Sequence, residues 1–106
     1  MSKQTVLTFG EYIRGLREST GLPLRKVAAQ LDIDPSLLGK IERNTRQPNR
    51  DIIKKLAEIF DQNEDYLLFE YLSDQIAYKV LEEQGDPKVL KVAEKKIKYL
   101  KTKENA

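Results

Sequence analysis

The sequence predicts an all-α protein, and three observations lead to this prediction. Helix-capping residues recur at short intervals, apolar residues follow spacings of three and four, and alternating strand patterns are almost absent. Four short helices followed by two longer ones is the expected order. We expect a flexible arm at residues 1–7, a five-helix domain at 8–68 and a C-terminal helical extension at 69–106.

The first expected helix begins at the stretch TFGE, residues 8–11, which has the form of a capping box. In this box the Thr8 hydroxyl suits the amide of Glu11, and the Glu11 carboxylate suits the amide of Thr8. Gly21 is expected to end this helix. A second, short helix is expected over residues 24–31, and its expected buried residues are Leu24, Val27, Ala28 and Leu31.

The third expected helix begins at Asp34, because aspartate is a good N-cap and Pro35 suits the first helical position. Leu38 and Ile41 are its expected core residues. Asn49 is expected to cap a fourth helix. The inward-facing residues of that helix are expected to be Ile52, Ile53, Leu56, Ala57 and Phe60.

Two longer helices are expected to follow. The fifth begins at Asn63 or Asp65 and ends near residues 83–84. The sixth begins at the Asp-Pro pair of residues 86–87, which repeats the cap-plus-proline start, and runs to about Lys101.

Composition argues against catalysis and against a membrane location. The 106 residues contain neither cysteine nor histidine, so disulfides, thiolate chemistry and most neutral-pH acid–base dyads are excluded. No apolar run approaches the roughly 18 residues that span a membrane, and no stretch resembles a signal peptide. We therefore expect a cytoplasmic protein that is not an enzyme, with no cofactor, metal, membrane partner or small-molecule effector.

Charge is distributed unevenly along the chain, although the net charge is only +2. All six arginines lie in the first half, and Glu42 is the only acid between Pro35 and Arg50. Residues 63–87 carry seven acids and one lysine, whereas residues 88–106 carry seven lysines and two acids. Since arginine suits phosphate and guanine edges, this distribution predicts a binding half and a packing half.

Only Asp32, Ile33 and Asp34 join the second and third expected helices. Two short helices with a turn of this length have the geometry of a helix-turn-helix, whose second helix enters the DNA major groove. The turn requires a left-handed residue, and Asp32 is suited to that conformation. Ala28 is small where the two helices must approach closely.

At this point the chain resembles the XRE-type helix-turn-helix of phage Cro and repressor proteins, over residues 9–68. The segment IERNTRQP, residues 41–48, is the most specific part of the resemblance. The other matching features are Leu16-Arg17, Gly21-Leu22, Val27-Ala28, Leu31, Ile33 and Leu56-Ala57. The resemblance implies a repressor-type domain that binds double-stranded DNA. It also implies a structural ion pair between Arg17 and Glu42.

Two positions depart from the family pattern. Leu24 stands where family members usually have a glutamine that touches the DNA backbone, and Asn44 stands where a glycine often ends the recognition helix. Asparagine is the next best residue for a left-handed cap.

The resemblance assigns residues of the third helix and its end to DNA. Pro35, Ser36, Leu37, Gly39 and Lys40 are expected on the exposed face. The expected base contacts are Ser36, Leu37 and Lys40, with Lys40 suited to guanine and Leu37 to a thymine methyl group. The expected phosphate contacts are Arg25, Arg43, Asn44, Thr45 and Arg46. With so few polar readers, DNA shape is expected to supply part of the specificity.

Each assignment has a simpler alternative. Arg43, Arg46 and Arg50 would also be suitable as solvated charges at a helix end. Leu37 would belong to the core if the helix phase differed by one position. The lysine-rich last helix suits a solvated face, and Lys3 is a further candidate for contact with DNA.

The C-terminal extension carries more apolar residues than one small domain covers. The expected homodimer interface comprises Phe69, Leu72, Ile76, Val80, Leu90, Ala93, Ile97 and Leu100. The alternative is a hairpin that packs on its own chain, and the two are compatible. Charge pairing between the acidic stretch and the lysine-rich helix suits either arrangement.

We therefore expect a sequence-specific DNA-binding transcriptional regulator, a repressor, that binds an inverted-repeat operator as a dimer. The alternative is a protein-interaction module or antitoxin whose C-terminal helices bind a partner protein. An enzyme remains the least favoured class.

Overall fold

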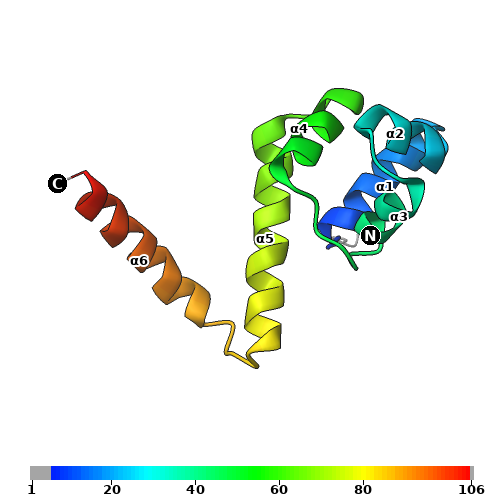
Figure 1. The fold of residues 1–106 in the computed structure, drawn as a ribbon. Helices are drawn as coiled ribbons and strands as arrows, with labels where there is room; N and C mark the ends of the chain where they lie inside the picture. Colours follow the sequence, from blue (N-terminus) through cyan, green and yellow to red (C-terminus); the bar gives the residue numbers. More distant parts are fainter. Residues whose placement is uncertain (1–5, 106) are drawn as a thin grey trace, which may run out of the picture. The chain divides into compact units, whose positions relative to one another are not determined.

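The computed structural model describes residues 6–105, which form an all-α fold (Figure 1), as predicted. It divides into two compact units, one ending at Asp74 and the other beginning at Gln75. The helices are α1 (Phe9–Ser19), α2 (Leu24–Leu31), α3 (Pro35–Glu42), α4 (Arg50–Ile59), α5 (Glu64–Glu82) and α6 (Val89–Glu104). Most of the predicted N-terminal arm, including Lys3 and its expected DNA contact, lies outside the described residues.

The capping box predicted at the start of α1 is present. The Thr8 amide donates to Oε1 of Glu11 at 3.0 Å, and the Glu11 amide donates to Oγ1 of Thr8 at 3.3 Å. The Thr8 amide, followed by the Thr8 hydroxyl, which donates to the same carboxylate oxygen at 3.0 Å, lowers the pKa of the Glu11 carboxyl, because both bonds favour its charged form. Gly21 follows the end of α1 with φ 72°, in the left-handed conformation expected there.

Two residues that are distant in sequence complete the start of α1. The Phe9 amide donates to Oδ2 of Asp74 in α5 at 2.8 Å, and the Gly10 amide donates to Oδ1 of Asn44 at 3.1 Å. The side-chain amide of Asn44 also donates to Oγ1 of Thr8 at 2.6 Å. The four amides that begin a helix usually lack partners within it, and all four have partners here.

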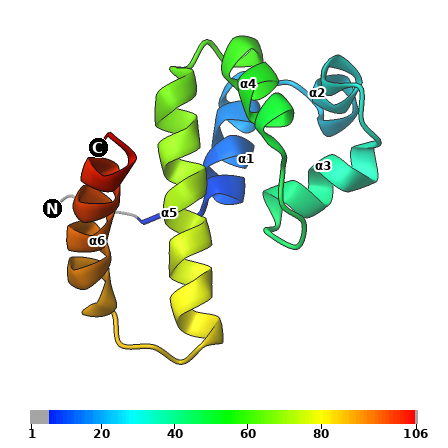
Figure 2. The same cartoon turned by 60° about the vertical axis from the view of Figure 1, so that its left-hand side comes forward.

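The helix-turn-helix consists of α2, the turn at residues 32–34 and α3 (Figure 2). Asp32 ends α2 with φ 57°, which confirms the predicted left-handed turn residue. Asp34 caps α3 by accepting the Ser36 amide at 2.9 Å. This contact, followed by that of the Ser36 hydroxyl, lowers the pKa of the Asp34 carboxyl.

The core lies among the first five helices. Its buried residues are Phe9, Ile13, Val27, Ala28, Leu31, Leu38, Ile41, Ile52, Ile53, Leu56, Ala57, Phe60 and Leu67. This set includes every predicted inward-facing residue of α4. Leu24, predicted as buried in α2, is partly buried and packs against this core.

The first unit continues past residue 68 because α5 packs on the start of α1. The Tyr71 ring meets the Phe9 ring edge-on, with 6.0 Å between their centroids. Leu67 is completely buried, and Asp74 accepts the Phe9 amide. These contacts tie α5 to the helix-turn-helix unit as far as Asp74.

The second unit comprises the end of α5, a turn and α6. Gln84 has φ 52° and follows the end of α5. The helix α6 begins at Val89, later than the predicted start at residues 86–87. The reason is a turn in which Asp86 accepts the amide of Lys88 through its side chain and that of Val89 through its carbonyl, both at 2.9 Å.

The helix α6 ends at Glu104, beyond the predicted end near Lys101, and none of its residues is buried. No helix within residues 6–105 has both the length and the apolar character required to cross a membrane.

Candidate nucleic-acid interface

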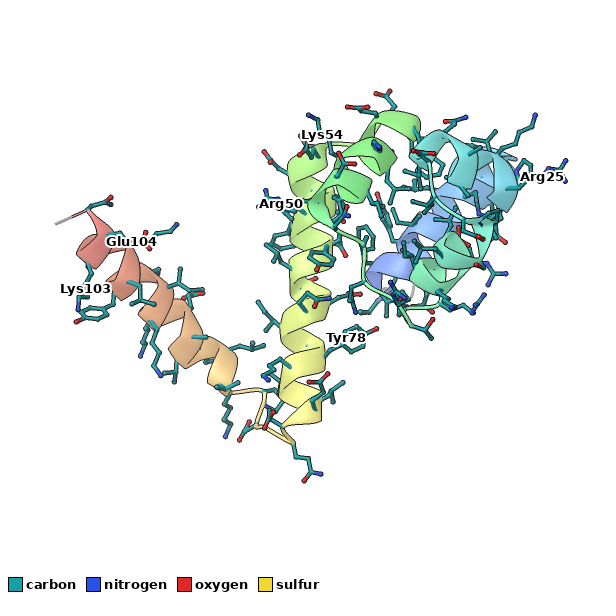
Figure 3. All side chains as sticks on the ribbon, in the orientation of Figure 1. Arg25, Arg50, Lys54, Tyr78, Lys103 and Glu104 are labelled. Carbon is teal, nitrogen blue, oxygen red and sulfur yellow. The ribbon has the colours of Figure 1, made fainter. Side chains whose placement is uncertain are left out.

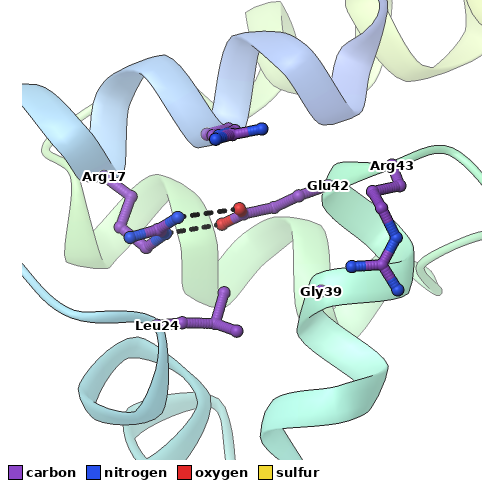
Figure 4. Close-up of a pocket in the computed structure, with 6 residues that line it drawn as sticks. Arg17, Leu24, Gly39, Glu42 and Arg43 are labelled. Atoms are coloured by element: carbon purple, nitrogen blue, oxygen red, sulfur yellow. Dashed lines mark hydrogen bonds and ion pairs between the residues drawn. The ribbon is translucent and has the colours of Figure 1, made fainter.

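A paired charge holds α1 against the end of α3. Arg17 Nε donates to Oε2 of Glu42 at 2.7 Å, and Arg17 Nη2 donates to Oε1 at 3.0 Å (Figure 4). The side chains are only 14% and 5% exposed, and the guanidinium also donates to the Leu22 carbonyl. The hydrogen bonds with Glu42 raise the pKa of Arg17. The structure therefore joins the two residues that the resemblance paired.

The expected base-contacting residues lie along α3. Ser36 and Lys40 are exposed and stand one helical turn apart. The Ser36 hydroxyl donates to Oδ1 of Asp34 at 2.9 Å. Leu37 is partly buried and packs against the core. The alternative that Leu37 belongs to the core therefore holds for part of this side chain.

Gly39 is buried, which corrects its expected place on the exposed face of α3. The Arg43 guanidinium and the Leu24 side chain lie over it. An ideal Cβ at Gly39 would meet Nη1 of Arg43 at 3.1 Å and a methyl carbon of Leu24 at 3.8 Å.

The segment after α3 bears several of the expected phosphate contacts. Arg43, Thr45 and Arg46 are exposed. Asn44 has φ 62°, the left-handed conformation predicted for it. Its side chain is bound to Thr8 and to the Gly10 amide, so one N–H of its amide group remains for another partner.

Arg25 stands apart from this segment. It is exposed on α2 and projects outward (Figure 3). Arg50 and Lys54 are also exposed, on α4.

A hollow of about 220 Å³ opens between α1, α2 and α3 (Figure 4). It is lined by Arg14, Arg17, Leu24, Gly39, Glu42 and Arg43.

Asp74 is the one acid of α5 that reaches the start of α1 through a hydrogen bond in the described residues. Burial raises the pKa of its carboxyl, while the Phe9 amide acts in the opposite direction and Glu70 adds to the rise. The folded chain therefore binds this proton more tightly than the unfolded chain does. The stabilisation that protonated Asp74 gives the folded chain is fully present below the usual pKa of aspartate. It is lost as pH rises through the raised pKa of the folded state.

The short turn between α2 and the capped α3 defines a helix-turn-helix domain. Residues 10–73 match the family described as helix-turn-helix domain, and the chain belongs to that family.

Three proteins illustrate what the chain is similar to. The HTH-type transcriptional regulator ImmR of Bacillus subtilis is 29% identical over 62 residues, which are 58% of this chain and 49% of ImmR. The chain thus spans about half the length of this curated relative. The restriction-modification controller protein C.AhdI from Aeromonas hydrophila is 34% identical, with a TM-score of 0.52 over 56% of this chain and 89% of that one.

The third protein is SinR, the master regulator for biofilm formation. Its structure in complex with DNA is 27% identical, with a TM-score of 0.53 over 57% of this chain and 98% of that one. The structure of a SinR–SinI complex matches 90% of this chain with a TM-score of 0.54 and 20% sequence identity. An identity this low indicates the fold alone.

These matches confirm the resemblance to XRE-type repressors and agree with the expectation that the protein is not an enzyme. Sequence reasoning did not single out Arg14, Gly10 or Asp74. The spacing of Arg14 and Arg17 would have placed both on one face of α1. Nothing local pointed to Asp74, because its partner lies 65 residues away.

Proposed function

We propose that the protein is a sequence-specific DNA-binding transcriptional regulator. The observation that carries this proposal is a short, capped helix with Ser36 and Lys40 exposed and with Arg43 and Arg46 at its end. Two similar proteins support the same function, because ImmR is named as a transcriptional regulator and SinR has been solved in complex with DNA.

In this proposal α3 lies in the major groove. Lys40 donates to guanine O6 and N7, the Ser36 hydroxyl reaches a neighbouring base edge, and the exposed part of Leu37 touches a thymine methyl group. Because these direct contacts are few, groove width and DNA flexibility supply the remaining specificity.

The backbone contacts come from exposed polar residues around the helix-turn-helix. They are Arg25, Arg43, Asn44, Thr45 and Arg46. Such contacts set the position of the protein on the duplex and carry no sequence information themselves. Asn44 would contribute only its remaining amide N–H, since the rest of its side chain is bound to α1.

We also propose that the C-terminal helices join two copies, which would place two α3 helices about one DNA turn apart. Exposed apolar side chains support this assignment. They are Phe69, Leu72 and Ile76 of α5 and Leu90, Ile97 and Leu100 of α6, each at least 47% exposed. Val80 and Ala93 are partly exposed between them. Occupation of an inverted-repeat operator would repress the promoter beneath it.

The test is selection of DNA from a random pool by the purified protein, followed by affinity measurements at several salt concentrations. We expect an inverted repeat with half-sites about ten base pairs apart. Lys40→Ala should relax one base position and cost about 1–3 kcal/mol there. Arg43→Ala should weaken all sequences alike and lower the salt slope by about 0.9. Failure to recover any motif would contradict sequence-specific binding.

A second candidate function is binding of a partner protein, as in an antitoxin. The exposed apolar residues of α6 favour it, and SinR has been solved with the protein SinI. Under this alternative the protein would select no DNA motif and would be monomeric until its partner is added.

A further inference from the structure

The hollow between α1, α2 and α3 is unusually rich in guanidinium groups. Arg14, Arg17 and Arg43 line it, and Glu42 is its one acid among the described residues. Both carboxylate oxygens of Glu42 accept hydrogen bonds from Arg17, so these two charges compensate each other. The two remaining positive charges make the hollow attractive to an anion.

Arg14 and Arg43 both have donors to spare. Arg14 pairs with Glu18 through Nε alone, at 3.3 Å, and both side chains of that pair are more than half exposed. An ion pair this exposed contributes little and gives way readily. Arg43 makes no side-chain hydrogen bond or ion pair within the described part of the chain. Neither guanidinium is therefore fixed by a strong competing partner.

Part of the hollow is open because Gly39 has no side chain. An ideal Cβ at this position would meet Nη1 of Arg43 at 3.1 Å, so a larger residue would fill the space that the guanidinium borders. Leu24 supplies an apolar wall. The donors that an anion would meet thus come from α1 and from the C-cap of α3.

The position of Arg43 links the hollow to the proposed DNA-facing side of α3. Ser36, Lys40 and Arg43 are spaced by four and three residues, which places them on one face of the helix. Arg43 is therefore the residue at which the exposed face of α3 meets the hollow. A duplex docked along that face would present its backbone beside Arg43.

We propose that this hollow binds one backbone phosphate of the DNA, held by Arg14 from α1 and by Arg43, the C-cap residue of α3. The inference rests on the proposed DNA-binding function and adds a contact from α1 to it. Arg17 acts as a positioning residue, because its pairing with Glu42 removes the negative charge that would repel the phosphate. Two guanidinium groups from different helices would also fix the angle of α3 in the groove.

The experiment compares Arg14→Gln, Arg43→Gln and the control Lys54→Gln on the DNA that the intact protein selects. Lys54 is an exposed residue of α4, and its substitution by glutamine removes one positive charge at a position outside the hollow. Each hollow variant should lower the slope of log affinity against log salt by about 0.9, and the control should leave it nearly unchanged. Arg14→Lys, which keeps the charge, should retain most of the slope.

A scan with single methylphosphonate groups, which are neutral, identifies the phosphate itself. One backbone position should weaken the intact protein but have little further effect on Arg14→Gln or Arg43→Gln. Inorganic phosphate at constant ionic strength should compete only weakly with DNA. Saturating competition at micromolar phosphate would instead assign the hollow to a free anion and overturn the proposal.

The outcomes separate this inference from the function on which it rests. If Arg14→Gln behaved as Lys54→Gln while Arg43→Gln lost affinity, the hollow would not be a phosphate site, although the protein would still bind DNA. If the intact protein bound no duplex, the proposed function and this inference would both be overturned.

Discussion

At the residue scale, Glu42 illustrates how a charge is accommodated within a small core. Its carboxylate is 5% exposed and receives two hydrogen bonds from Arg17. A buried charge is tolerated when its partner and hydrogen bonds replace the water it has lost. The pair therefore matters chiefly through what would follow if one member were removed.

We expect Glu42→Gln to reduce the free energy of unfolding by about 3–5 kcal/mol, because Arg17 would keep a largely buried charge without its counter-charge. Urea denaturation would measure the change. Glu18→Gln is the matched control. It removes a carboxylate from an exposed pair and should change stability by at most about 0.5 kcal/mol. Equal effects of the two substitutions would contradict a structural role for the buried pair.

Asn44 marks the limit of prediction from residue type. Its left-handed conformation could be predicted, because asparagine is one of the residue types that tolerate positive φ. Its hydrogen bonds to Thr8 and Gly10 did not, because the partners lie 36 and 34 residues away. Local sequence specifies the backbone conformation of such a residue, whereas its side-chain contacts depend on how the helices pack.

At the scale of secondary-structure elements, the start of α1 packs directly on the end of α3. A Cβ at Gly10 would overlap the carbonyl oxygen of Ile41 and lie 2.6 Å from that of Glu42. Backbone atoms of a helix end are not free to move aside as a flexible side chain would be. The packing of the two helices therefore requires glycine at this position.

Gly10→Ala should accordingly destabilise the fold by about 1–3 kcal/mol, since α1 must shift away from α3. Gly15→Ala is the control in the same helix. A Cβ there meets nothing within 4 Å, and alanine should raise stability by about 0.5–1 kcal/mol. Thermal unfolding of both variants would test the pair. A neutral Gly10→Ala would contradict the close approach of the two helices.

Helix positions were predictable where a cap fixed them. Asp34 with Pro35 and Asn49 fixed the starts of α3 and α4, and the observed starts agree. The same Asp-Pro signal at residues 86–87 gave a wrong start for α6, because Asp86 organises a turn before that helix. The burial of Gly39 was also missed, since helical phase alone does not reveal that the side chains of Leu24 and Arg43 will cover this glycine.

At the scale of the whole molecule, apolar side chains remain exposed on both long helices. Leu72 is 49% exposed on α5 and Ile97 is 53% exposed on α6. The helical spacing of the apolar residues in the sequence predicts that these side chains share a face of each helix. Periodicity could not predict which of them would meet a second copy in the proposed dimer, because the contacts of a dimer depend on how two chains pack.

We expect Leu72→Glu and Ile97→Glu each to raise the dissociation constant of the dimer at least tenfold, about 1.4 kcal/mol, because each would place a charge in the proposed interface. Sedimentation equilibrium would measure the effect, and the larger effect would identify the principal helix. Leu81→Glu, at a position that is 72% exposed and outside the proposed interface, serves as the control. A monomeric intact protein would contradict the proposed dimer.

The fully bonded start of α1 has a consequence for hydrogen exchange. The first amides of a helix usually exchange with solvent quickly, because no carbonyl within the helix accepts them. Here the Phe9 amide donates to Asp74 of α5, and the Gly10 amide donates to Asn44, the second residue after α3. Each can exchange only when its partner moves away, so two adjacent amides report separately on local opening at α5 and at the segment after α3.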